Sequence, residues 1–279
     1  MPIAKVNGVE IYYETQGSGE PILLLPPNWW PCATWNVGVV PALAKQFRTI
    51  IYDGRDTGQS EKPADGYTVK QFAADGIELL QQLGVARCHL VGFAIGGQIV
   101  QAMAIQQPDL VASLTISTTG PGVRRLDGTM REVGPEALDE IKKIGFEKYI
   151  LEHIDNDHMA YNPEYYRDHR QQAAELARAL WSGQSTVEQY RIHELARLTW
   201  DTLAEAPKIK VPTLVLCGAD DGVERRGSTP EATARRLAPL IPGAELALVP
   251  GVRHMTFWDG DGALKVLHDF LARHPIGAK

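Results

Sequence analysis

The sequence predicts an α/β protein with a doubly wound, mostly parallel sheet and a helical insertion. Short apolar runs alternate with helical patterns along most of the chain, which is typical of strands and helices that wind around one sheet. The later apolar runs contain few polar residues, as expected for parallel strands that helices cover on both faces. The alternation stops over residues 122–207, where only helical patterns occur.

The predicted strands lie on both sides of this insertion. The first of them, Val9–Tyr13, alternates apolar and polar residues, as a half-exposed strand does. The other predicted strands are Pro21–Leu25, Thr49–Tyr52, Cys88–Gly92, Ala112–Ile116, Thr213–Cys217 and Glu245–Val249.

The predicted core helices lie between or after these strands. Val69–Leu83 has apolar residues at helical spacing and is followed by Gly84, a residue type that commonly ends helices. A second helix is expected over Gly97–Gln107, because Pro108 follows it. The remaining two are Pro230–Leu240 and Ala263–Arg273.

The insertion is expected to form a helical cap. Its predicted helices are Pro135–Ile150, Pro163–Trp181 and Thr186–Glu205. Ligands of open α/β sheets bind at the carboxyl edge of the strands, so we expect the cap to cover that edge. The predicted domain organisation is therefore a core formed by residues 1–121 and 208–279, with the cap formed by residues 122–207.

Length and composition exclude several classes of protein. The 279 residues, of which 44% are hydrophobic, suffice for one large core. A net charge of −6 without a clustered basic face argues against nucleic-acid binding. The N-terminus lacks the apolar core of a signal peptide, and no stretch is long enough to span a bilayer.

The cysteines indicate a reducing compartment. Cys32, Cys88 and Cys217 are far apart and odd in number, which suits free thiols packed as small apolar side chains in the cytoplasm. The Cys and His residues show no metal-ligand spacing. We therefore expect neither a metal nor another cofactor.

The stretch HLVGFAIGGQIVQAMA, residues 89–104, combines an apolar strand, a glycine-flanked turn and a helix. Its centre, Gly92-Phe93-Ala94-Ile95-Gly96, matches the pattern G-x-S-x-G, in which a nucleophilic serine occupies a sharp strand-to-helix turn. Ala94 stands in the serine position. Taken alone, G-x-A-x-G is also compatible with a turn that does no chemistry.

Two later stretches place an acid and a histidine at strand ends. TLVLCGADD ends at Asp221, and LVPGVRH ends at His254. The strand-to-helix turn at Ala94, the acid and the histidine follow one another in the chain order of the α/β-hydrolase triad. Three such residues in this order, each after its own strand, are much harder to explain as ordinary loop residues than one of them would be.

From about Val6 to Phe270 the chain resembles the α/β-hydrolase superfamily, and more specifically its esterases and lactonases. The stretches that carry the resemblance are LVGFAIGG, YDGRDTGQS, TLVLCGADD and LVPGVRHMTFW. The second of them resembles the D-x-R-D-T-G-x-S loop of methylesterase-like members, in which Arg55 is expected to be structural. The resemblance implies the α/β-hydrolase fold with a helical cap inserted after the sixth strand, and a hydrolase that needs no cofactor. It assigns the triad acid to Asp221 and not Asp220, and the triad base to His254.

The loop after the early strand departs from the family pattern. It reads Pro26-Pro27-Asn28-Trp29-Trp30 where His-Gly is usual. Since proline has no N–H, the resemblance assigns the oxyanion hole to the backbone N–H groups of Asn28 and Ile95. The expected substrate contacts are apolar or aromatic: Trp29, Trp30, Phe93, Met255 and Trp258. Core packing explains Met255 and Trp258 equally well.

Ala94 leaves three hypotheses. In the first, the chain is an inactivated Ser→Ala variant of a hydrolase for a small apolar ester or lactone, suited to substrate trapping. In the second, the alanine is natural and His254, oriented by Asp221, acts as a general base on water or on a substrate proton in a C–C hydrolase, lyase or decarboxylase. In the third, the chain is a non-catalytic ligand-binding protein of the same fold. All three imply a small-molecule partner and neither nucleic acid nor membrane, and they leave a homodimer open.

Overall fold

The computed structural model describes residues 2–27, 29–130, 135–149, 161–222 and 228–277. Within them, eight strands form one sheet in the order β1-β2-β4-β3-β5-β6-β7-β8. The strands are β1 (Ile3–Val6), β2 (Val9–Gln16), β3 (Glu20–Leu25), β4 (Phe47–Tyr52), β5 (Cys88–Phe93), β6 (Val111–Ser117), β7 (Thr213–Gly218) and β8 (Glu245–Val249). The β1–β2 and β2–β4 pairs are antiparallel and all other pairs are parallel. The predicted fold class is confirmed.

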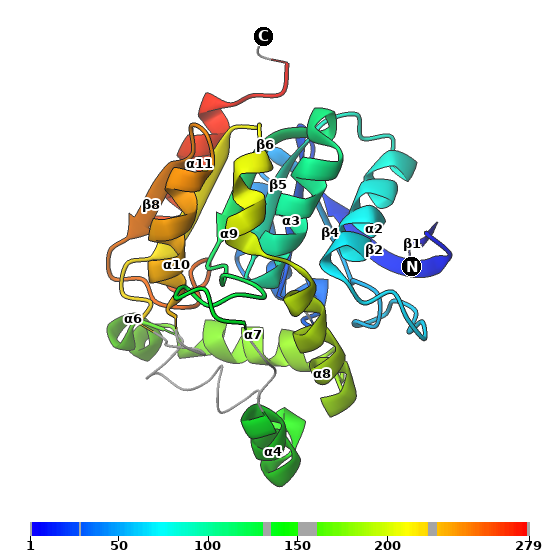
Figure 1. Ribbon diagram of the computed structural model, residues 1–279, viewed down its shortest axis with the longest axis vertical. Coiled ribbons are helices and arrows are strands. Elements are labelled where there is room, and N and C mark those ends of the chain that lie inside the picture. The colour runs from blue at the N-terminus through cyan, green and yellow to red at the C-terminus, as the bar shows by residue number, and fades with distance from the viewer. Residues whose placement is uncertain (1, 28, 131–134, 150–160, 223–227, 278–279) are drawn as a thin grey trace.

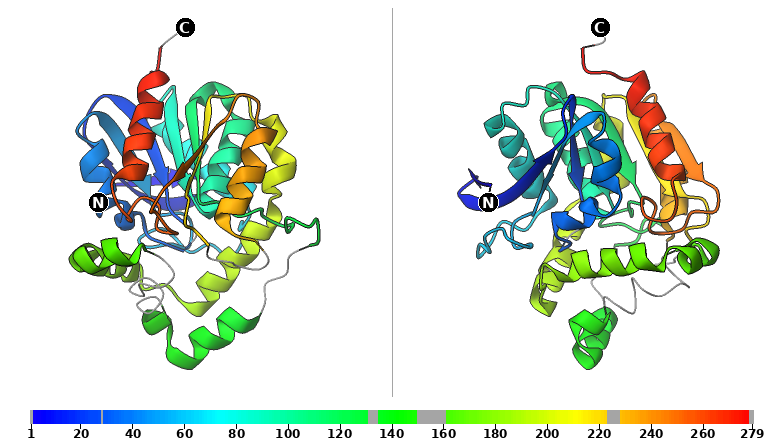
Figure 2. Two further views of the ribbon diagram at one scale, coloured as in Figure 1. Left: turned by 90° about the vertical axis from the view of Figure 1, so that its left-hand side faces the viewer. Right: turned by 180° about the vertical axis from the view of Figure 1, so that it is seen from behind.

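Alternate residues of the central strands face two apolar cores, one on each side of the sheet. In β3, Ile22 and Leu24 belong to one core, whereas Leu23 and Leu25 belong to the other, as the two-residue period of a strand requires. Helices α1 (Val39–Leu43) and α11 (Gly262–Arg273) contribute to the first core, and α2 (Val69–Gln82), α3 (Ile95–Gln106) and α10 (Pro230–Leu237) contribute to the second. Figure 1 shows α2, α3 and α10 in front of the sheet, and the view from behind in Figure 2 brings α11 forward.

The segment between β6 and β7 contributes helices that lie across one end of the sheet (Figures 1 and 2). They are α4 (Pro135–Ile144), α6 (Pro163–Asp168), α7 (Arg170–Trp181) and α8 (Val187–Ala196). The last helix of the segment, α9 (Thr202–Glu205), lies in front of the sheet beside α3 and α10 (Figure 1). The Ser185 hydroxyl donates to the Trp29 carbonyl (3.1 Å), and the Gln189 amide donates to the Asp56 carbonyl (2.8 Å). Because Trp29 and Asp56 follow β3 and β4, the helices contact the carboxyl edge of the sheet. The cap limits at residues 122 and 207 remain a prediction.

Two of the predicted cap helices are interrupted. Pro163–Trp181 divides at His169, whose φ of −125° is not helical. Its ring stacks on Tyr165 at 3.8 Å, and its Nδ1 bonds the Tyr165 carbonyl. Thr186–Glu205 divides at Trp200, which is extended (φ −133°, ψ 136°) because its indole is buried against α3. A tertiary contact therefore outweighs local helical preference at Trp200, whereas the break at His169 is accompanied by local contacts with Tyr165.

Three further boundaries differ from the prediction. The antiparallel edge strand β1 was not predicted, and it precedes a turn in which Asn7 and Gly8 both have positive φ. Helix α3 begins at Ile95, two residues before the expected start. Helix α4 ends at Ile144 because Gly145, with φ of 89°, follows it; Ile150, its predicted end, lies outside the described residues.

Candidate active site

Residue 94 occupies a sharp bend between β5 and α3. Ala94 has φ of 54° and ψ of −117°, a backbone conformation that residues with a side chain rarely adopt. Its N–H donates to the Ser117 carbonyl (3.0 Å), and its carbonyl accepts the Thr119 hydroxyl (2.9 Å) and the Gly97 N–H (3.1 Å). Contacts with the end of β6 therefore hold the strained residue in place, and its side chain is half-buried.

The glycines around this bend are needed for close approach of backbone segments. A Cβ atom on Gly92 would collide with the Gly96 carbonyl, and a Cβ on Gly97 would collide with the Thr119 hydroxyl. The strand and helix can therefore meet at this angle only if both positions lack a side chain. This geometry is what the G-x-S-x-G pattern provides for a nucleophile.

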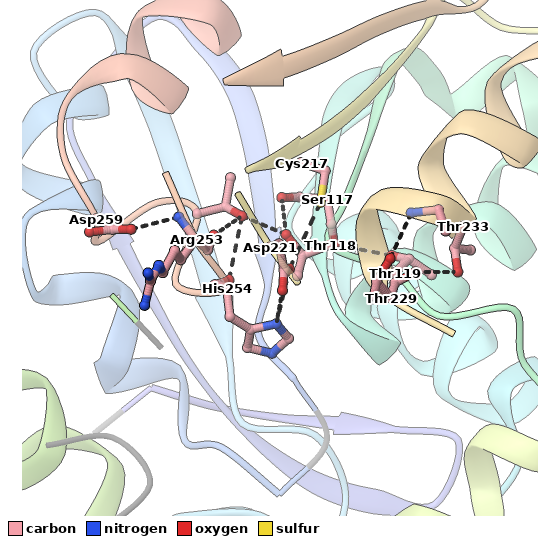
Figure 3. Close-up of polar contacts among 12 residues, drawn as sticks. Ser117, Thr118, Thr119, Cys217, Asp221, Thr229, Thr233, Arg253, His254 and Asp259 are labelled. Atoms are coloured by element: carbon pink, nitrogen blue, oxygen red, sulfur yellow. Dashed lines mark hydrogen bonds and ion pairs between the residues drawn. The ribbon is translucent and has the colours of Figure 1, made fainter. Parts of the chain in front are cut away.

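Asp221 and His254 meet at the carboxyl edge of the sheet (Figure 3). Asp221 follows β7, and His254 lies in the loop after β8. His254 Nδ1 lies 3.1 Å from Asp221 Oδ2 and 3.4 Å from Oδ1. The Asp221 side chain is fully buried, and the His254 side chain is 17% exposed. An Nδ1–H that donates to this carboxylate leaves Nε2 as the ring nitrogen able to accept a proton.

The backbone at the end of β7 positions this pair. Gly218 packs against the carbonyls of Val252 and Arg253, where a Cβ would collide with both. The Ala219 N–H donates to the Val249 carbonyl (2.9 Å) and the Asp220 N–H to the Val252 carbonyl (3.1 Å). The loop that carries His254 is therefore fixed against the residues that precede Asp221.

Polar side chains behind the pair were not singled out from the sequence. The Thr118 and Thr256 hydroxyls are 2.6 Å apart, and Thr118 has φ of 51°. They tie the end of β6 to the His254 loop. The Cys217 sulfur lies 3.9 Å from Asp221 Oδ2, and burial raises the pKa of this thiol. Cys217 therefore stays protonated and can donate weakly to the carboxylate.

One of the two predicted oxyanion donors can be placed. The Ile95 N–H opens α3 and has no hydrogen-bond acceptor within the described part of the chain. The amino end of a helix carries a partial positive charge, so this N–H suits a developing oxyanion. Asn28, the other predicted donor, lies outside the described residues.

The predicted substrate-contact residues divide into two groups. Trp29 packs against the cap residues Phe146 (ring centroids 5.0 Å apart) and Tyr190 (5.8 Å), and Trp30 is also buried. Phe93, the residue before Ala94, packs against His254 at 6.0 Å.

Met255 and Trp258 are both 1% exposed. The Trp258 indole packs on Trp35 at 5.0 Å and donates to the Val37 carbonyl (2.9 Å). These contacts are those of core side chains, and contact of either residue with a substrate stays a prediction.

Arg55 has structural contacts, as expected for its loop. Its Nε and Nη2 donate to the two oxygens of Asp75 at 2.7 and 2.9 Å, and its Nη1 donates to the Asp65 carbonyl at 3.3 Å. Both members of the ion pair are buried. Arg55 therefore joins α2 to the loop after β4.

The described residues offer neither a metal-binding cluster nor a membrane-spanning helix. Across the described ranges, no three His, Cys, Asp or Glu side chains are grouped so that they could hold a metal ion. The same part of the chain contains no helix with the length and apolarity that crossing a membrane requires.

Comparisons with known proteins agree with this fold. The profile of a family described as "alpha/beta hydrolase fold" matches residues 25–261. The chain is 29% identical over 277 residues to the "Putative carbamate hydrolase RutD" of Stutzerimonas stutzeri, covering 94% of this chain and 97% of that protein.

Two solved structures are also similar. The enol-lactonase from Burkholderia xenovorans LB400 has a TM-score of 0.79 and 26% identity, with 97% of this chain and 100% of that chain covered. Est816, described as an N-acyl homoserine lactone degrading enzyme, has a TM-score of 0.74 and 26% identity, with 98% and 99% covered. With the fold and the match over residues 25–261, these findings identify the chain as a member of the α/β-hydrolase family of hydrolases.

Proposed function

We propose that this site is that of a carboxylic-ester or lactone hydrolase that works by acyl transfer, and that Ala94 occupies its nucleophile position. The observation that carries the proposal is the contact between His254 and Asp221 at 3.1 Å, at the same sheet edge as the strained bend at residue 94. Phe93, directly before the bend, packs on the His254 ring. An imidazole held by a buried carboxylate is the usual means of activating a serine hydroxyl.

With serine at position 94, the residues would act in a defined sequence. His254 Nε2 would take the hydroxyl proton while the serine oxygen attacks the carbonyl carbon. The Ile95 N–H would donate to the resulting oxyanion, and collapse of the intermediate would release the alcohol with the proton from His254. His254 would then deprotonate a water that hydrolyses the acyl-enzyme.

With Ala94, this covalent route is closed. A methyl group cannot attack a carbonyl, and loss of one triad member leaves about 10³–10⁴-fold acceleration over water from binding and the oxyanion hole. We infer that Ala94 is an inactivating Ser→Ala change that leaves a site able to hold its substrate. The backbone strain supports this inference. A φ of 54° is energetically unfavourable for alanine, and such strained conformations occur mainly at functional positions.

The substrate class is inferred from the walls of the site and from the relatives. Trp29, Trp30 and Phe93 favour a small apolar acyl compound. The names of the similar proteins refer to enol-lactones, N-acyl homoserine lactones and carbamates. In each of these an acyl carbon carries a leaving group, which acyl transfer requires.

A second function is supported by the same pair. Because His254 keeps its carboxylate partner without a serine, it could act as a general base on water or on a substrate proton, as in a C–C hydrolase, lyase or decarboxylase. A non-catalytic ligand-binding protein would bind its ligand in this site without needing His254 or Asp221 as catalytic groups.

Restoring the serine distinguishes these functions. The chain as it stands, the Ala94→Ser variant and an Ala94→Ser/His254→Ala control are compared on p-nitrophenyl esters and γ-lactones. We expect Ala94→Ser to raise kcat/KM by about 10³-fold or more, and the control to lose that gain. Turnover by the unchanged chain that serine does not increase would favour the general-base function. Binding without turnover in any variant, unaffected by His254→Ala, would favour a binding protein.

A further inference from the structure

We propose that Asp259 is a positioning residue that ties the loop carrying His254 to the cap, so that His254 is correctly placed only while the cap is docked. The proposal rests on the proposed function of the His254–Asp221 pair. Asp259 itself is not placed in contact with the reacting atoms.

The Asp259 carboxylate is buried between two backbone N–H groups from different parts of the fold. It lies five residues after His254, just before α11, and is 2% exposed. Oδ2 accepts the Arg253 N–H at 2.6 Å, a contact visible in Figure 3. Both carboxylate oxygens lie 2.8 Å from the backbone nitrogen of Asn162. One side chain therefore bonds the residue before His254 and the residue that opens a cap helix.

Asn162 strengthens this connection from the cap side. Its side-chain oxygen accepts the N–H groups of Glu164 (2.9 Å) and Tyr165 (3.3 Å), so it caps α6. Its side-chain nitrogen donates to the Gly251 carbonyl at 2.9 Å, three residues before His254. The first turn of α6 and the His254 loop thus share two independent hydrogen-bonded contacts.

Burial makes the two N–H donors interdependent. Burial raises the pKa of Asp259, and the hydrogen bonds from Arg253 and Asn162 oppose that rise. If α6 moves away, the carboxylate loses one of its two backbone donors, so the acceptor of the Arg253 N–H is held less firmly. Displacement of the cap is therefore coupled to displacement of the backbone next to His254.

Other contacts of this loop lead to the core. Trp258 donates to the Val37 carbonyl, and Thr256 bonds Thr118. These contacts would persist if α6 moved. The cap can therefore act on His254 through Asp259 without unfolding the core beneath it.

The first test measures how well the His254–Asp221 pair activates a serine at position 94, and it does not require knowledge of the substrate. In the Ala94→Ser background, the second-order rate of labelling by a fluorophosphonate reports how well His254 activates the serine. Asp259→Asn replaces one acceptor oxygen by an NH₂ group that faces a donor. Asn162→Asp keeps an α6-capping oxygen but opposes the Gly251 carbonyl and Asp259 with negative charge. Asp269→Asn, the same chemical change on an exposed residue of α11, is the matched control.

We expect Asp259→Asn and Asn162→Asp each to slow labelling by about 10- to 100-fold, the range for a catalytic group misplaced by about 1 Å. The control should stay within about twofold. An unchanged rate in a folded Asp259→Asn variant would overturn the proposal. If that variant does not fold, the same criterion applies to Asn162→Asp.

The second test uses hydrogen exchange in the chain with Ala94. Peptides over residues 161–168 and 250–256 should gain exchange together in Asp259→Asn and remain protected in Asp269→Asn. Faster exchange in only one of the two segments would contradict the coupling. If Ala94→Ser is not labelled at all, the proposed function fails, and the exchange data alone decide whether Asp259 joins the two segments.

Discussion

Replacing Ala94 by glycine should raise the free energy of unfolding, because the bend stores backbone strain. A non-glycine residue in such a sparsely populated conformation costs about 1–3 kcal/mol. Against this gain, glycine loses about 0.4–1 kcal/mol more conformational entropy on folding. Removal of a half-buried methyl costs less than about 0.8 kcal/mol. The expected net change is about 1 kcal/mol in favour of the glycine variant.

The assay is urea denaturation followed by circular dichroism, with Ala104→Gly as the matched control. Ala104 lies within α3, where the same substitution costs about 1 kcal/mol of helix stability. The two variants should therefore change stability in opposite directions. If Ala94→Gly destabilises the chain as much as Ala104→Gly does, residue 94 is not strained and the assignment of the bend as a nucleophile elbow loses its support.

Two further predictions concern buried ionisable residues. Asp75→Asn should lower the free energy of unfolding by about 3–5 kcal/mol, because it leaves the buried Arg55 guanidinium without its carboxylate; a loss under 1 kcal/mol in urea titrations would contradict this. Burial lowers the pKa of His193 to about 4. Since the unfolded chain takes up this proton near pH 6.5, the His193 contribution should be complete above that pH and decrease by about 3 kcal/mol as the pH falls from about 6.5 to about 4. His193→Gln should remove this part of the pH dependence, and an unchanged slope would show that another group causes it.

The fold could be predicted because it depends on local sequence and chain order, and the same features led to the proposed site residues. Parallel strands bring their carboxyl ends to one edge, so residues that follow β5, β7 and β8 were expected at the same edge of the sheet. The need for glycine at positions 92 and 97 could also be predicted from the local pattern, since only glycine permits the close approach of the strand and the helix.

The features that sequence analysis missed depend mostly on tertiary contacts. No local pattern distinguishes Asp259 from Asp261, because Asp259 is buried and accepts a hydrogen bond from Asn162, which is far away in the chain. The same holds for the Thr118–Thr256 contact and for the helix break at Trp200. Strand β1 is an exception, since Asn7-Gly8 is a well-known hairpin turn signal that could have been used.

The most direct test of the proposed acyl transfer is the mass of the Ala94→Ser variant after a rapid quench with a p-nitrophenyl ester. We predict a mass increase of one acyl group, located by peptide mapping at residue 94 and absent when His254 is also changed to alanine. An Ala94→Ser protein that folds normally and binds the ester, but never carries an acyl group at that position, would contradict it.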